Sequence, residues 1–273
     1  MCLVTFAYQQ LDRISLIIAA NRDEWRQRPS VPAQIWDDEP LIYGGQDLVS
    51  SGSWLTISTR APFRLACVTN TRNPESINEY GTQTRRSRGL VVRDFTRDRS
   101  SCSDFLKSVP LEEYGACNLI LFDGDELWYA SNRTFDGQHH IVTQRLTPGV
   151  YGLSNAQLDT PWPKTVATRE TLERLIILTR GQEREASIEE LRDPLWTALS
   201  DPQIYPDDVL PSTGVSQELE RALSAALITG EDYGTRSQAL VFLGPTGARF
   251  EERLLDSRGA VTRAARRDFG ILP

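Results

Sequence analysis

Two apolar segments separated by a short polar break open the chain. Residues 2–8 form a nearly continuous apolar run with β-branched and aromatic side chains, and residues 14–20 form a second run. Runs of this length and composition predict buried strands. The break has the length of a turn, so we expect an antiparallel hairpin. A hairpin centred near Leu11–Asp12 places Cys2 opposite Asn21.

Cys2 can carry chemistry without a partner side chain. Removal of Met1 ahead of this small residue would leave a thiol and a free α-amine on one residue. An α-amine has a pKa of about 7.7–8.0, so it can act as the general base for the adjacent nucleophile. Such a mechanism needs no histidine, and the chain has only His139 and His140. The alternative is that a cysteine at the second position is inert.

The polar run Asn21–Glu24 follows the second apolar segment and would lie beside Cys2 in the predicted hairpin. Asp23 would orient the α-ammonium group, and Arg22 would favour the thiolate. The sequence therefore predicts a nucleophile, a base, a carboxylate and a guanidinium in one small volume. The alternative interpretation is a charged strand end in solvent.

Three further polar residues stand at the ends of predicted strands, where the backbone can direct a side chain into a cleft. Asn70 ends one strand, Asn155 ends another, and Arg236 begins a third. An asparagine amide can donate to a developing oxyanion, and the loss of one such donor costs about 3–4 kcal/mol of transition-state stabilisation. Taken singly, each asparagine fits an ordinary turn residue better, and Arg236 fits a structural ion pair equally well.

The order of the predicted elements indicates the fold class. Strands, helices, strands, helices and strands follow one another, and most connections are too short for parallel crossovers, which favours antiparallel sheets in an α+β chain. Several strands lack polar alternation, which indicates that both of their faces are covered. Two antiparallel sheets stacked on each other and flanked by helices satisfy both observations. We expect one domain over residues 1–273, with residues 257–273 as a basic surface strap.

Composition excludes several classes of partner. The formal net charge of −7 and the pI near 5.1 give no sign of nucleic acid or an anionic membrane as partner. No segment reaches the roughly 18 apolar residues of a membrane helix. The first residues lack the basic region of a signal peptide. We therefore expect a cytoplasmic protein without a membrane span.

The remaining motifs predict no metal and no cofactor. The four cysteines form no C-x-x-C pair. His139 and His140 fit a surface hairpin tip better than a metal site, because no cysteine or third histidine has suitable spacing. Residues 244–247, Gly-Pro-Thr-Gly, fit a hairpin turn and not a nucleotide-binding loop.

Four sequence blocks together resemble one known family. They are Met-Cys at the start, Asn-Arg-Asp-Glu at 21–24, the thirteen-residue block at 152–164, and Tyr-Gly-Thr-Arg-Ser at 233–237. From residue 2 to about residue 255 the chain resembles the NRDE family, which is related to transport and Golgi organisation protein 2. The long block, in the right order with the others, makes the resemblance specific.

That resemblance implies a fold similar to the N-terminal nucleophile hydrolases, a four-layer αββα sandwich. The layout is similar to choloylglycine hydrolases and penicillin V acylases, which also begin Met-Cys and use a processed cysteine. By position, Cys2 resembles the nucleophile and Asp23 the carboxylate that holds its amine. Asn70 and Asn155 resemble the two asparagines near the oxyanion, and Arg236 resembles the late arginine of the pocket.

Arg22 departs from the acylase pattern. The acylases carry their arginine three residues before the aspartate, where this chain has Ala20. Arg22 directly precedes Asp23, and positions 20 and 22 leave the same face of a strand, one pleat repeat apart. Arg22 is therefore expected to serve the same pocket.

The expected function is hydrolysis of an amide carbon–nitrogen bond other than a peptide bond, with a small-molecule amide or acyl ligand as substrate. Cys2 would attack the carbonyl, and its own amine would move the proton. The alternative is a non-catalytic carrier of haem or an acyl lipid in the same cleft, because the eukaryotic relatives of the resembled family are linked to haem trafficking and lipid metabolism.

Overall fold

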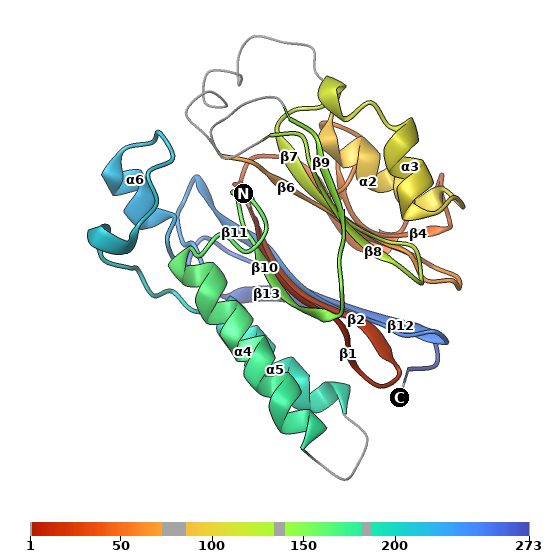
Figure 1. Ribbon diagram of the computed structural model, residues 1–273. Helices are drawn as coiled ribbons and strands as arrows, with labels where there is room; N and C mark the ends of the chain where they lie inside the picture. The colour runs from red at the N-terminus through yellow and green to blue at the C-terminus, as the bar shows by residue number, and fades with distance from the viewer. Residues whose placement is uncertain (1, 73–85, 134–139, 182–186, 273) are drawn as a thin grey trace. The chain divides into compact units, whose positions relative to one another are not determined.

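The structure is a computed structural model that describes residues 2–72, 86–133, 140–181 and 187–272. The chain divides into two compact units, each with one antiparallel sheet and helices packed against it (Figure 1). Unit 1 comprises Met1–Gln27, Pro148–Ser154 and Leu158–Pro273. Unit 2 comprises Arg28–Thr147 and Asn155–Gln157.

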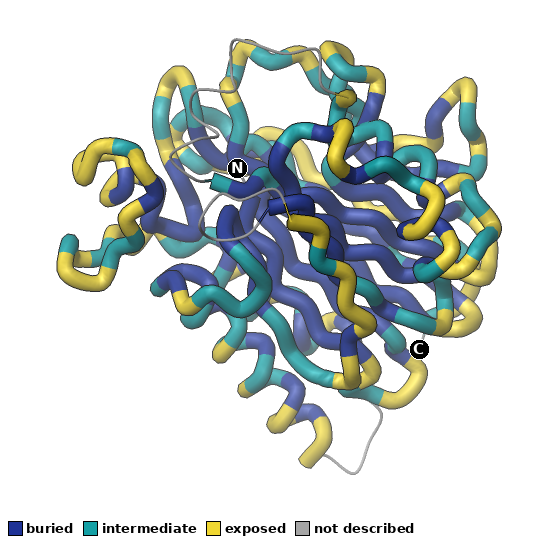
Figure 2. The backbone as a smooth tube through the Cα atoms, turned by 45° about the horizontal axis from the view of Figure 1, so that its top comes forward, coloured by how far each residue is buried: buried dark blue, intermediate teal, exposed yellow. Residues whose placement is uncertain are grey.

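Unit 1 is built on a six-stranded sheet in the order β10-β1-β2-β11-β12-β13, in which every neighbouring pair is antiparallel. Its central strands are rich in apolar residues and are buried along most of their length. Figure 2 shows buried backbone of this kind in dark blue. The six strands are β1 (Cys2–Leu11), β2 (Ile14–Trp25), β10 (Gly149–Leu153), β11 (Tyr233–Leu243), β12 (Gly247–Leu255) and β13 (Val261–Gly270).

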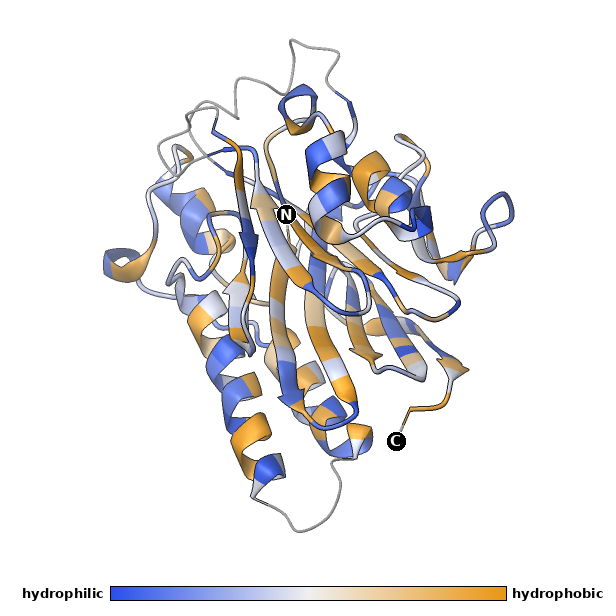
Figure 3. Cartoon of the chain, turned by 45° about the vertical axis from the view of Figure 1, so that its right-hand side comes forward, coloured by the Kyte–Doolittle hydropathy of each residue, from blue (hydrophilic) through white to orange (hydrophobic). Residues whose placement is uncertain are grey.

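Helices α4 (Pro163–Arg180) and α5 (Ile188–Leu199) cover one face of the unit 1 sheet. Their apolar side chains join those of β1, β2 and β11 in one core, which includes Leu172, Leu191 and Leu240. Figure 3 shows apolar and polar residues mixed along both helices. In α5 the buried residues are apolar, as expected of a helix that buries one face, whereas several buried residues of α4 are threonines. The shorter helical elements of unit 1 are α6 (Gln217–Ala222) and the 3-10 turn η3 (Asp207–Val209).

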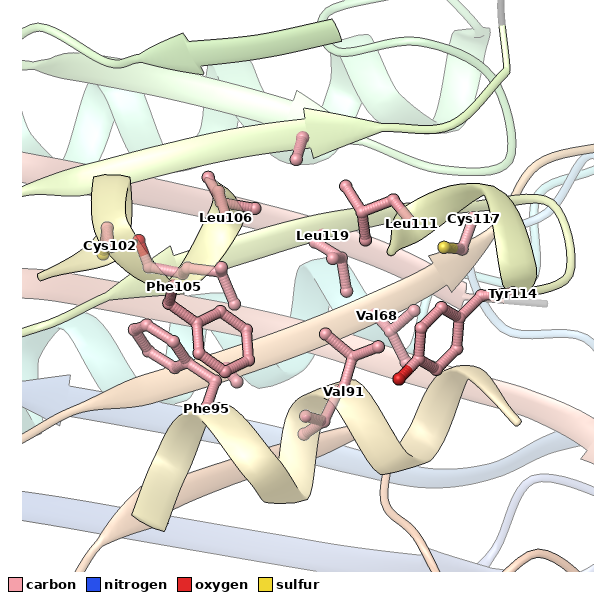
Figure 4. Packing of buried hydrophobic residues seen from close by; sticks show 14 residues of the cluster. Val68, Val91, Phe95, Cys102, Phe105, Leu106, Leu111, Tyr114, Cys117 and Leu119 are labelled. Atoms are coloured by element: carbon pink, nitrogen blue, oxygen red, sulfur yellow. Dashed lines mark hydrogen bonds between the residues drawn. The ribbon is translucent and has the colours of Figure 1, made fainter. Parts of the chain in front are cut away.

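Unit 2 contains a seven-stranded antiparallel sheet in the order β3-β4-β5-β6-β7-β8-β9. Figure 4 shows the core between this sheet and its helices, where the rings of Phe95 and Phe105 meet edge to face with centroids 5.1 Å apart. The elements of unit 2 are β3 (Ser30–Ile35), β4 (Ile42–Asp47), β5 (Leu55–Ser58), β6 (Leu65–Asn70), α2 (Arg88–Arg97), α3 (Cys102–Ser108), η2 (Leu111–Glu113), β7 (Cys117–Phe122), β8 (Leu127–Ser131) and β9 (Val142–Arg145).

The expected α+β class is confirmed, since each unit shows an antiparallel sheet with flanking helices. The αββα stacking of the two sheets stays a prediction, and so does the single domain over residues 1–273. Strands β3 and β9 were not predicted. Both are edge strands. An edge position lets β3 contain Pro32, whose missing N–H would interrupt a central strand.

The segment expected to be a surface strap, residues 257–273, contains a strand that was not predicted. Strand β13 lies at the sheet edge and pairs antiparallel with β12, and most of its side chains are exposed. The Asp256 carboxylate accepts hydrogen bonds from the Arg258 and Ala260 amides, and Gly259 adopts a φ of +82°. This turn reverses the chain, so the segment runs back along β12.

Shortening a core side chain of α5 should destabilise unit 1. Leu191 is fully buried, and Leu191→Ala should lower the free energy of unfolding by about 2–5 kcal/mol. Ile177→Ala is the matched control, since Ile177 lies on α4 but is 68% exposed, and its effect should stay within about 0.5 kcal/mol. Denaturant unfolding monitored by circular dichroism measures both. Equal effects would contradict the assigned core.

Candidate functional site

The opening hairpin forms, but its register differs by one residue from the prediction. Cys2 pairs with Arg22, and Leu3 pairs with Asn21. The turn lies at residues 12–13, later than predicted, and the register shifts again between Tyr8 and Leu11. The predicted pairing of Cys2 with Asn21 is therefore wrong.

This register sorts the polar residues of β2 onto two faces of the sheet. Directly paired residues of antiparallel strands point to the same side, and successive residues alternate. Cys2, Arg22 and Ser237 form one row across β1, β2 and β11, so their side chains share a face. Asp23 pairs with Thr235, and both point to the opposite face, where the helices of unit 1 pack.

Asp23 is fully buried and held by a hydroxyl group. The Thr235 Oγ1 donates to Asp23 Oδ1 at 2.7 Å, and the Ile228 amide donates to the same Oγ1 at 2.9 Å. Sequence reasoning missed Thr235. The only available signal was its place inside the Tyr-Gly-Thr-Arg-Ser block, because a threonine in a strand is otherwise unremarkable in sequence.

Burial is the largest influence on the pKa of the Cys2 thiol. The residue is 7% exposed, and burial raises the pKa of its thiol to about 11. The positive charge of Arg22 lowers this pKa, whereas the negative charge of Asp23 raises it. Arg22 also forms an ion pair with Glu24 at 3.7 Å. With Met1 present, the thiol is therefore neutral at physiological pH.

The backbone of Cys2 is fixed from the neighbouring strand. The Ser154 Oγ donates to the Cys2 carbonyl oxygen at 3.0 Å, and Ser154 is itself buried. Ser154 directly follows β10 and directly precedes Asn155 in the chain.

The two predicted asparagines lie together in unit 2. Asn155 is fully buried, and its Nδ2 donates to the Asn70 carbonyl oxygen at 2.8 Å. The Arg72 amide donates to the Asn155 carbonyl oxygen at 2.7 Å. Asn70 is the last residue of β6 and is partly exposed. The structure thus brings Asn70 and Asn155 into contact.

Asn118 supports this pair and was not predicted. Its fully buried side-chain amide donates to the Ala156 carbonyl oxygen at 2.8 Å and to the Thr69 hydroxyl at 3.1 Å. The Tyr129 hydroxyl donates to its Oδ1 at 2.8 Å. These bonds fasten the residue after Asn155 to the sheet of unit 2. In sequence, Asn118 stands inside an apolar strand, and a polar residue at such a position is the signal that could have identified it.

Arg236 lies where the register between β2 and β11 shifts. Thr235 pairs with Asp23 and Ser237 pairs with Arg22, so Arg236 is an extra, bulged residue between them. Its Nη1 donates to the Trp25 carbonyl oxygen at 3.1 Å. This bond places Arg236 at the end of β2, next to the Thr235–Asp23 pair. Its expected role in a pocket stays a prediction.

The described residues show neither a metal-binding cluster nor a membrane-spanning helix. Within the ranges the structure describes, no cluster of three or more His, Cys, Asp or Glu side chains could hold a metal ion. His140 is exposed, and His139 lies outside the described residues. None of the four cysteines forms a disulfide. Among the described helices, none is long and apolar enough to cross a membrane.

Comparison with solved structures gives weak likenesses. One is a Caenorhabditis elegans N-acylethanolamine-hydrolyzing acid amidase ortholog, with a TM-score of 0.44 and 8% identity over 71% of this chain and 85% of that chain. Another is penicillin V acylase from Agrobacterium tumefaciens, with a TM-score of 0.46 and 8% identity over 92% of this chain and 82% of that chain. Likeness at this level carries no conclusion about activity.

Comparison with characterised sequences is stronger. A transport and Golgi organization protein 2 homolog of Bos taurus is 34% identical over 275 residues, which cover 93% of this chain and 92% of that protein. The Homo sapiens homolog is 32% identical over 270 residues, with the same two coverages. The Drosophila melanogaster protein is 26% identical over 260 residues, which cover 89% of this chain and 88% of that protein.

The family model described as Transport and Golgi organisation 2 matches residues 1–257. This match covers nearly the whole chain and confirms the resemblance inferred from the four sequence blocks. The chain belongs to the Transport and Golgi organisation 2 family.

Proposed function

We propose that the protein is a hydrolase of small-molecule amide carbon–nitrogen bonds other than peptide bonds, with Cys2 as its nucleophile after removal of Met1. One observation carries the proposal. Cys2 begins β1 directly opposite the guanidinium-bearing residue Arg22, while the carboxylate of Asp23 is held in place by Thr235 one residue further along β2.

The proposal includes removal of Met1 because the pKa of the Cys2 thiol is too high for a nucleophile at neutral pH. A pKa of about 11 leaves little thiolate at neutral pH. Processing would give Cys2 its own α-ammonium, and a positive charge on the same residue stabilises the thiolate. The freed amine has an ordinary pKa of about 7.7–8.0, so it can accept and return a proton near neutral pH.

The proposed reaction has two halves, acylation of Cys2 and hydrolysis of the resulting thioester. The Cys2 sulfur bonds to the substrate carbonyl carbon, and its proton passes to the α-amine, directly or through a water molecule. The carbon–nitrogen bond then breaks, the ammonium returns the proton to the leaving amine, and a thioester remains. Water next attacks the thioester carbonyl and gives a proton to the amine. The carbon–sulfur bond breaks, and the ammonium returns its proton to the departing sulfur, which releases the carboxylic acid and restores the thiol and the free amine.

The oxyanion that forms in each half needs hydrogen-bond donors. In this proposal Asn155 and Asn70 supply them, as the family resemblance implies, and each is worth about 3–4 kcal/mol of transition-state stabilisation.

The remaining roles follow from charge. Asp23 holds the α-ammonium, Arg22 favours the thiolate, and Arg236 binds a polar group of the ligand in the pocket. A cytoplasmic location completes the proposal, because reducing conditions keep the Cys2 thiol free.

Substitution of the nucleophile tests the proposal. In Cys2→Ala, turnover of a panel of N-acyl amides with graded acyl lengths should fall to background, because the sulfur that forms the thioester is removed. Cys67→Ala is the matched control, since Cys67 is also buried but lies inside β6. Release of free amine, quantified by mass spectrometry, measures turnover. Unchanged turnover in Cys2→Ala would contradict the proposal.

The thiol should titrate differently with and without Met1. Thiolate forms as pH rises through the pKa, so the protein with an uncleaved extension before Met1 should alkylate slowly below about pH 11. The processed protein should alkylate fully at a clearly lower pH. Rates of Cys2 alkylation by iodoacetamide across pH, followed by peptide mass spectrometry, give both midpoints. Coincident midpoints would show that the α-amine does not influence the thiol.

The alternative of a haem or acyl-lipid carrier stays a prediction. No described contact favours it over the hydrolase, and a spectral titration with haem separates the two. A Soret shift that Cys2→Ala abolishes would support the carrier. Equal spectra for the two proteins would leave Cys2 without a role in haem binding.

A further inference from the structure

Lysine is almost absent from this chain, and one of its two lysines is buried. Lys107 and Lys164 are the only lysines among thirty basic residues. The Lys107 side chain is 73% exposed and pairs with Asp104, as a surface lysine is expected to do. Lys164 is 2% exposed. Burial of an ammonium group is unfavourable unless hydrogen-bond acceptors of the protein replace its water. The burial of Lys164 must therefore be compensated by specific contacts.

The helix that contains Lys164 does not stabilise its buried charge. Lys164 is the second residue of α4, and the N-terminal end of a helix carries partial positive charge that repels a cation. Its acceptors lie elsewhere in unit 1. Its Nζ donates to the Leu223 carbonyl oxygen at 2.8 Å and to the Ala225 carbonyl oxygen at 3.4 Å. A compact ammonium with three donors suits two closely spaced carbonyls better than the planar fork of arginine does.

These carbonyls belong to residues 223–228, which we call the anchored segment. It follows α6, contains no helix or strand, and is buried at every residue. Buried backbone without regular structure must find other hydrogen-bond partners. Besides Lys164, the Asn21 Nδ2 donates to the Ala226 carbonyl oxygen at 2.8 Å. The Leu227 amide in turn donates to the Asp201 carbonyl oxygen at 2.8 Å. Lys164 and Asn21 are therefore two of the side chains that hold the carbonyls of the anchored segment.

The far end of the anchored segment meets Thr235 through two hydrogen bonds. The Thr235 amide donates to the Ile228 carbonyl oxygen at 2.8 Å, and the Ile228 amide donates to the Thr235 hydroxyl oxygen at 2.9 Å. Because that hydroxyl already accepts from Ile228, its single proton is directed to the Asp23 carboxylate, 2.7 Å away. Lys164 thus holds one end of the anchored segment, and the other end, three residues further along the backbone from Ala225, holds Thr235 and through it Asp23.

We propose that Lys164 is a positioning residue for Asp23, which it acts on through the anchored segment and the Thr235 hydroxyl. This inference rests on the proposed function, in which Asp23 holds the α-ammonium of processed Cys2. Loss of the Lys164 ammonium releases two carbonyls of the anchored segment, and Asp23 then holds the Cys2 amine less closely.

The α-amine of Cys2 is the direct readout. In processed protein labelled with [15N]cysteine, the only cysteine amine nitrogen is that of Cys2, and its chemical shift followed against pH gives the amine pKa. A nearby carboxylate stabilises the ammonium and raises this pKa, so Asp23→Asn should lower it by about one pH unit. Lys164→Met should lower it in the same direction by about half a unit, and Lys107→Met should leave it unchanged.

Two further variants keep the test decisive. If Lys164→Met does not fold, Lys164→Arg retains the charge with the wrong donor geometry and should give the same direction of shift. Thr235→Val removes the hydroxyl and should lower the amine pKa, while Thr235→Ser should restore it. A folded Lys164 variant with lower thermal stability and an unchanged amine pKa would overturn the inference.

Failure of the inference can be told apart from failure of the proposed function. If Asp23→Asn shifts the amine pKa and the Lys164 variants do not, only the role of Lys164 is wrong. If Asp23→Asn itself has no effect, the amine is not held by Asp23, and that part of the proposed function fails together with the inference.

Discussion

The pairing of Cys2 with Arg22 in the β1–β2 hairpin is the constraint on which the candidate site depends. It places the thiol and the guanidinium on one face of the unit 1 sheet. The next residue, Asp23, must then point to the opposite face, among the polar groups beneath the sheet. A slip of one residue would exchange the two faces and put the carboxylate beside the thiol.

This separation suits the chemistry proposed for Cys2. A carboxylate next to the thiol would oppose its ionisation, and Asp23 does raise the pKa of the Cys2 thiol. Held on the other face by Thr235, the same carboxylate belongs to the residue directly after Arg22, the partner of Cys2 in the hairpin. A bulge at Arg236 makes this arrangement possible, because it lets Thr235 and Ser237 pair with adjacent residues of β2.

Local pattern predicted the elements but not their register. The apolar runs identified β1 and β2, and strand ends identified Asn70 and Asn155, which do lie in contact. The one-residue error at Cys2 arose because the turn and the register shift near Tyr8 depend on backbone conformation, including the positive φ of 50° at Gln9. Thr235 and Lys164 were missed for a different reason. Their roles depend on contacts with a segment that has no periodic pattern, and no spacing rule predicts such contacts.

The most direct measurement is the intact mass of the protein purified from cells without any extension at its amino terminus. The account requires a free α-amine on Cys2, so it predicts a mass lower than that of the full sequence by one methionine residue. A mass equal to that of the full sequence would show that Met1 is retained. Cys2 would then lack its own base, and the proposed mechanism would be contradicted.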